Sequence, residues 1–242
     1  WIVPISCKIF NLIVYFESIF SFFFMTIPCK HAKVCVVGEV SVGKTCIINR
    51  TINDDYQNDY KPTVAEAFRY KYTKDGQNVE FQIWDTAGAV EYRTLLNLYM
   101  QKSNVIIVVY DITDSDSYQA LRRWAQDIPQ DIFDSGLVVL VGNKTDLEES
   151  RKIEFSQAEN FSVEHDFSKC FEVSAKTGEG IANLWEFIAT SPEIQNLPDD
   201  STIVENTTNN TANGAADDDQ GIFSTIFGYL NNFYQYIKSF FW

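Results

Sequence analysis

The sequence predicts an α/β fold in which helices flank a six-stranded, mostly parallel sheet with one antiparallel edge strand. Three observations support this: apolar runs alternate with amphipathic stretches, a glycine-rich loop joins a strand to a helix, and an Asp-Gly pair divides a hairpin. A chain of 242 residues is long enough for one domain with a sizeable core and extensions.

The strands are expected where short apolar runs carry few charges. Five runs have the composition of strands buried on both faces: residues 33–37, 79–84, 104–112, 136–142 and 169–175. FRYKYTKDGQNVEFQIW adds an antiparallel edge strand, because it has the pattern of a hairpin with Asp75 and Gly76 at the turn. Apolar residues at helical spacing predict helices over residues 44–51, 115–128, 156–164 and 181–190.

Four segments are expected along the chain. Residues 1–28 are an apolar extension, and their apolar run from Ile9 to Ile27 is close in length to the ~20 residues that cross a bilayer. Two readings stay open: a membrane anchor, or a segment absent from a protein that starts at Met25. Residues 29–191 form the domain. Residues 192–220 are acidic and poor in core-forming side chains, which predicts a disordered linker. Residues 221–242 are an aromatic amphipathic tail, either an interfacial helix or one that docks on a partner or on the domain.

Charge and cysteine usage exclude several classes of function. A net charge of -14 argues against general attraction to nucleic acid or to an anionic membrane surface. The five cysteines form no CxxC pair and no familiar metal-ligand spacing, so the sequence predicts neither a disulfide framework nor a zinc site. A reducing, cytoplasmic setting fits. No cysteine follows Cys170, so a prenyl anchor is not expected.

The stretch GEVSVGKT, residues 38–45, lies between a predicted strand and a predicted helix, the context that a phosphate-binding loop needs. Glycines let the backbone wrap a phosphate chain, and the helix N-terminus directs positive charge at it. Lys44 would reach the outer phosphates, and the Thr45 hydroxyl would bind Mg²⁺. The predicted phosphate-binding residues are Gly38, Glu39, Val40, Ser41, Val42, Gly43, Lys44, Thr45 and Cys46.

Two further motifs end the last two predicted strands, and both fit a guanine site. Asp146 of NKTD can accept hydrogen bonds from the two adjacent donors on the guanine edge, an arrangement that adenine lacks. The amide of Ala175 in SAK can meet the guanine oxygen. The predicted base-binding residues are Asn143, Lys144, Asp146, Ser174, Ala175 and Lys176.

With GEVSVGKT, YKPTVAEAF, WDTAG, NKTD and SAK in this order, residues 30–190 resemble the Ras superfamily of small GTPases, and its Rab branch most closely. The resemblance implies a P-loop NTPase fold, GTP or GDP with Mg²⁺ as ligands, and a GTP-regulated switch in vesicle traffic, with a lean toward endocytic Rab proteins. It also implies effector proteins, an exchange factor and a GTPase-activating protein as partners, at the cytosolic face of endomembranes.

The resemblance carries roles to individual residues. Thr63 and Asp85 match the Mg²⁺ residues besides Thr45, with Asp85 acting through water, and Thr63 and Gly88 match the groups that sense the terminal phosphate. Tyr56 falls where an aromatic ring stacks on guanine. Three aromatic residues match the triad through which Rab proteins bind effectors: Phe68, Trp84 and Tyr99. The alternative role for these three is packing in the sheet and hairpin.

The resemblance implies catalytic roles for Lys44, Thr63, Gly88 and the residue at position 89. Two departures from the family pattern bear on catalysis. Ala89 stands where the family has its water-orienting glutamine, which predicts slow GTP hydrolysis unless Glu91 or another group compensates. Val40 adds bulk near the terminal phosphate. The rival readings are a GTP-binding scaffold that does not hydrolyse GTP, and an ATP-dependent enzyme, against which Asp146 argues.

Overall fold

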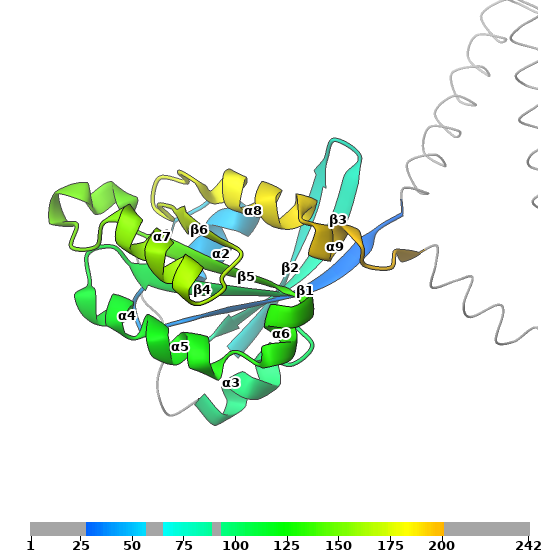
Figure 1. Cartoon of the computed structure of the whole chain (residues 1–242). Helices are drawn as coiled ribbons and strands as arrows, with labels where there is room; N and C mark the ends of the chain where they lie inside the picture. The colour runs from blue at the N-terminus through cyan, green and yellow to red at the C-terminus, as the bar shows by residue number, and fades with distance from the viewer. Residues whose placement is uncertain (1–27, 57–64, 89–92, 201–242) are drawn as a thin grey trace, which may run out of the picture. The chain divides into compact units, whose positions relative to one another are not determined.

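The predicted α/β architecture is confirmed by a computed structural model, which describes residues 28–56, 65–88 and 93–200 (Figure 1). The six strands are β1 Lys30–Gly38, β2 Ala65–Lys74, β3 Gln77–Thr86, β4 Val105–Asp111, β5 Leu137–Asn143 and β6 Lys169–Glu172. They lie side by side in the order β2-β3-β1-β4-β5-β6. Only the β2–β3 pair is antiparallel, so β2 is the predicted antiparallel edge strand.

The hairpin between β2 and β3 turns where the sequence predicts. Lys74 pairs with Gln77, which leaves Asp75 and Gly76 as the two loop residues. Their φ angles are 50° and 80°. A two-residue hairpin needs positive φ at both central positions, and Asp-Gly supplies this at little strain.

Helices pack on both faces of the sheet (Figure 1). Their bounds are α2 Lys44–Asn53, α3 Arg93–Met100, α4 Ser115–Gln119, α5 Leu121–Asp127, α6 Gln130–Ser135, the 3₁₀ helix η2 Thr145–Ser150, α7 Phe155–Glu164, α8 Ile181–Thr190 and α9 Pro192–Gln195. Among these helices, none has both the length and the apolar character that crossing a bilayer requires.

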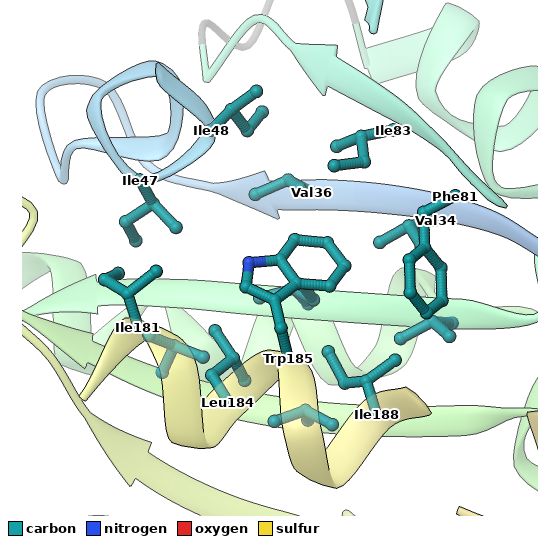
Figure 2. Close-up of a cluster of buried hydrophobic side chains, with 14 of the residues drawn as sticks. Val34, Val36, Ile47, Ile48, Phe81, Ile83, Ile181, Leu184, Trp185 and Ile188 are labelled. Carbon is teal, nitrogen blue, oxygen red and sulfur yellow. The ribbon is translucent and has the colours of Figure 1, made fainter. Parts of the chain in front are cut away.

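Two hydrophobic clusters, one on each face, hold the layers together. Side chains alternate along β1: Val34 and Val36 pack toward α2, α8 and α9, whereas Cys35 and Val37 pack toward α3, α5, α6 and α7. In the first cluster Trp185 of α8 lies between its helix and the sheet (Figure 2). Its ring centroid is 5.1 Å from that of Phe81 and 5.2 Å from that of Tyr70.

The structure differs from the sequence prediction in the helices. Residues 115–128 form two helices that meet at Ala120, and α3, α6 and α9 were not predicted. Residues 192–200, which the prediction placed at the start of a disordered linker, include α9 with Ile194 fully buried. They also reach β1, since Asp199 forms a bridge with Lys30. The domain therefore extends beyond residue 191, because one buried isoleucine and backbone pairing anchor a polar segment. Residues 201–220, like the two predicted terminal segments except for Pro28, lie outside the described residues.

Replacing Trp185 by Phe should lower the free energy of unfolding by about 1–3 kcal/mol. The indole is 1% exposed, and its Nε1 donates to Thr51 Oγ1 at 2.8 Å, so the smaller ring loses both a buried hydrogen bond and packing. Leu98→Ala is the control, because Leu98 is 59% exposed and should change stability by less than about 0.5 kcal/mol. Urea unfolding monitored by circular dichroism measures both; equal stabilities would contradict the role given to the indole.

Candidate nucleotide-binding site

The predicted nucleotide-binding residues that the structure describes gather at one edge of the sheet. The glycine-rich loop follows β1, Asp85 lies near the end of β3, NKTD begins at the end of β5, and SAK follows β6. All four strands run parallel, so their carboxyl ends meet at this edge, where open α/β sheets bind ligands.

The glycines of the loop at residues 38–43 are required because neighbouring atoms lie too close to leave room for a Cβ atom. A Cβ on Gly38 would lie 2.3 Å from the carbonyl oxygen of Val109, and one on Gly43 would lie 2.2 Å from Asn143 Nδ2. Both have positive φ, 144° and 97°, which side chains rarely adopt. On the other side, a Cβ on Gly88 would lie 2.5 Å from the backbone nitrogen of Val40. The loop is thus closely packed against the backbone of Val109 and Gly88 and against the side chain of Asn143, which fits a phosphate cradle.

Lys44 is the strongest sign that this cradle takes an anion. Its side chain is buried, and Nζ donates to the carbonyls of Gly38 at 2.9 Å and Glu39 at 2.7 Å. Burial lowers the pKa of Lys44 to about 8, although Asp85 and Glu39 oppose the shift. A phosphate beside Nζ would restore the charged form, so the residues present fit a nucleotide phosphate chain.

Nucleotide binding should therefore take up a proton at alkaline pH. About one unit above the lowered pKa, Lys44 is mostly neutral in the nucleotide-free protein and is charged beside a phosphate, so uptake should approach one proton per GDP. Calorimetric titrations in two buffers of different ionisation enthalpy give this number. Lys176→Met, which removes an exposed lysine of the same site, should keep the uptake; its absence in the unmodified chain would contradict the assignment.

The donor set beside Lys44 also fits Mg²⁺. Thr45 Oγ1 donates to Asp85 Oδ2 at 2.6 Å, and Asp85 is 1% exposed. A hydroxyl and a carboxylate are the oxygen ligands that Mg²⁺ prefers. When bound, the ion would supply positive charge to the outer phosphates. Thr63, the third predicted metal residue, lies outside the described residues.

Asn143 joins the phosphate loop to the base-binding loop. Its Nδ2 donates to the carbonyl of Val42 at 2.8 Å, and its Oδ1 accepts from the Ala175 amide at 3.1 Å. Ala175 was predicted to meet the guanine oxygen; here its amide is directed to Asn143, so a base contact would have to share this donor. The next residue, Lys144, pairs with Asp111 Oδ2 at 2.6 Å.

Asp146 is held in place by its neighbours in the predicted base site. Its Oδ1 accepts from Ser174 Oγ at 2.6 Å, and its Oδ2 lies 3.6 Å from Lys176 Nζ. The Ser174 hydroxyl also accepts the Thr177 amide at 3.1 Å. An oriented, partly buried carboxylate at this position fits recognition of the paired donors of guanine.

Two supporting residues were missed by the sequence reasoning. Arg50 of α2 donates to the carbonyl oxygens of Ala175 at 2.9 Å and Lys176 at 2.7 Å, and so fixes the SAK loop. Arg123 of α5 pairs with the Glu39 carboxylate, which also accepts from Trp124 Nε1 at 3.0 Å. Neither contact has a local sequence signal, because the partners are far apart in the chain.

The predicted effector triad divides between the two faces of the sheet. The rings of Trp84 and Tyr99 lie 5.4 Å apart and pack beside the cluster that faces α3, and Lys33 Nζ lies 5.6 Å from the Trp84 ring. Phe68 packs against the opposite cluster. The structure thus joins two of the three residues, Trp84 and Tyr99, by packing on one face of the sheet.

The other predicted site residues are less constrained. Cys46 is half-buried one residue after Thr45, and burial raises the pKa of its thiol. Val40 is 44% exposed beside the loop. Tyr56 follows α2, and its amide donates to Asp55 Oδ1 at 2.8 Å. Ala89, like Thr63, lies outside the described residues.

Comparison with known proteins identifies the family. Residues 33–193 match the Ras family. The chain is 40% identical over 131 residues to the GTP-binding protein YPT1 of Saccharomyces cerevisiae, an alignment covering 54% of this chain and 64% of that protein. It is 34% identical over 164 residues to the Ras-related protein RabC of Dictyostelium discoideum, covering 66% of this chain and 83% of that protein. The chain therefore belongs to the Ras family of small GTPases, as a Rab-type member of a family that binds GTP and GDP with Mg²⁺ and hydrolyses GTP.

Proposed function

We propose that this Rab-type GTPase is a membrane-traffic switch that keeps its bound GTP for longer than a member carrying the usual glutamine would. The observation that carries the proposal is Ala89, whose methyl group has no polar atom to orient the attacking water. The binding residues support retention of nucleotide, because Lys44, Asn143 and Asp146 are held in a connected site.

The remaining charge stabilisation would come from groups that are present. Lys44 and the amides of residues 38–43 would bind the phosphates, stabilising the charge that builds up as the terminal phosphoryl group leaves. Gly88 packs against the backbone of Glu39 and Val40, so its amide lies beside the loop. Loss of the terminal phosphate would release Gly88 and Thr63 and so change both switch segments.

Membership of the family indicates which classes of partner the protein has, and not which particular proteins they are. The switch would be loaded by an exchange factor, read by effectors and turned off with the help of an activating protein, at the cytosolic face of endomembranes. Trp84 and Tyr99 are the residues we propose for effector contact. The apolar terminal segments, residues 1–28 and 221–242, are the proposed means of membrane contact, because their apolar and aromatic side chains could be buried at a lipid interface.

The function is tested by loading the full chain with GTP and measuring single-turnover hydrolysis with Mg²⁺, alongside a competition of GTP with ATP. Selective GTP binding with slow cleavage supports the proposal. GTP binding with no cleavage, even with excess activating protein, would favour the scaffold reading. Preferential ATP binding would overturn the assignment of Asp146.

A further inference from the structure

A thiol, an imidazole and a carboxylate meet at the opposite end of the sheet from the nucleotide site. A ligand atom from each of Cys29, His31 and Asp200 lies within 4.8 Å of the other two. Cys29 and His31 flank Lys30, where β1 begins, whereas the phosphate loop follows Gly38, where β1 ends. The cluster is therefore separate from the residues assigned to GTP.

The backbone brings the three groups together. Residues two apart in extended chain project to the same side, which aligns Cys29 with His31. Lys30 and Asp199 form an antiparallel bridge, and the Asp200 amide donates to the Cys29 carbonyl at 3.1 Å. Antiparallel pairing therefore sets Asp200 opposite Cys29. Lys30 Nζ also donates to the Leu197 carbonyl at 2.8 Å, which fixes the approach of this segment.

Burial and charge differ between the three groups. Cys29 is 9% exposed, whereas the side chains of His31 and Asp200 are 50% and 57% exposed and meet at 2.8 Å. Burial raises the pKa of the Cys29 thiol, so at neutral pH a bound cation would have to displace its proton. The thiol is therefore the least exposed of the three groups, and the side chains of His31 and Asp200 are in contact with solvent.

We propose that Cys29, His31 and Asp200 bind a Zn²⁺ ion, with water completing a four-coordinate shell. Sulfur, nitrogen and oxygen donors together favour Zn²⁺, whereas Mg²⁺ and Ca²⁺ prefer oxygen alone. Tetrahedral zinc, with bonds of about 2.0–2.3 Å, needs ligand atoms roughly 3–4 Å apart. Rotation of the exposed His31 and Asp200 side chains can close the remaining gap.

The ion would tie the end of the described domain to its first strand. No zinc site could be predicted from sequence, because the spacing of the cysteines is uninformative and Asp200 lies 169 residues from His31 along the chain. The three ligands are close together only in the folded protein, so the ion should bind the folded state more tightly than the unfolded state and stabilise it. The inference is independent of GTP hydrolysis, since neither Ala89 nor Lys44 takes part.

The test uses the full chain loaded with GDP and Mg²⁺, titrated with Co²⁺ as a spectroscopic probe and then with Zn²⁺. We expect a thiolate-to-cobalt charge-transfer band that stoichiometric Zn²⁺ removes. Cys29→Ser should abolish the band, and His31→Ala or Asp200→Asn should weaken metal binding by about tenfold or more. Cys170→Ser is the matched control, because it removes a free thiol that is buried like that of Cys29 but lies elsewhere, and it should keep the band.

A second measurement separates metal binding from misfolding. GDP affinity should be the same in the Cys29, His31 and Asp200 variants as in the unmodified chain, and Zn²⁺ should raise the unfolding temperature of the unmodified chain but not of Cys29→Ser. Absence of the band, or a band that survives Cys29→Ser, would overturn the proposal.

Discussion

Replacing Asp146 by Asn should weaken GTP binding by about 10³-fold, or about 4 kcal/mol. The carboxylate would accept two hydrogen bonds from guanine, whereas the amide offers one acceptor and turns its NH₂ group toward a donor. Ser174 Oγ donates to Asp146 Oδ1 at 2.6 Å. If the new side chain of the Asp146→Asn variant rotated to keep its NH₂ group away from guanine, it would lose this hydrogen bond as well. Equilibrium binding of a fluorescent GTP analogue measures the change.

The control for Asp146→Asn is Glu149→Gln, which makes the same change of charge at an exposed position of the same 3₁₀ helix, η2. Its GTP affinity should stay within about twofold, since surface changes of this kind have small effects. A nucleotide with a carbonyl in place of the guanine amino group should bind the Asn variant better than GTP does. If Asp146→Asn binds GTP as the unmodified chain does, Asp146 does not read the base.

The sequence could predict the sheet because strand signals are local. Buried parallel strands are continuous apolar runs, and Asp75-Gly76 fixes the hairpin turn, so both are visible in short windows. The helices were harder. Helix α6 spans six residues with Ile132 as its only buried side chain among those described, too few for a period to appear. Helix α9 depends on Ile194 packing into the core, which composition cannot show.

In the candidate site, too, some residues could be predicted from sequence and others could not. Lys44 and Asp146 could be proposed from the sequence because their motifs combine residue type with position after a strand. Arg50, by contrast, contacts backbone carbonyls 125 and 126 residues away, and any residue at those positions presents a carbonyl. Sequence patterns therefore predict the groups that would touch the nucleotide better than the groups that hold them, because the supporting contacts depend on the fold alone.

Replacing Ala89 by Gln should raise the single-turnover rate of GTP hydrolysis by about 10²-fold. Lys44 and the loop amides would stabilise charge equally in both proteins, so the added amide should change only the orientation of the attacking water. The rate of cleavage of bound radiolabelled GTP measures this, and GTP affinity should be unchanged, because residue 89 adds no predicted contact in the ground state.

Leu98→Gln is the control for Ala89→Gln, since it introduces the same side chain at a residue that is 59% exposed on α3. Its hydrolysis rate should match that of the unmodified chain. Equal and fast cleavage by all three proteins would mean that Glu91 or another group orients the water, and that Ala89 does not lengthen the GTP state. If all three fail to cleave even with an activating protein, restoring the amide is not enough, and the chain acts as a GTP-bound scaffold.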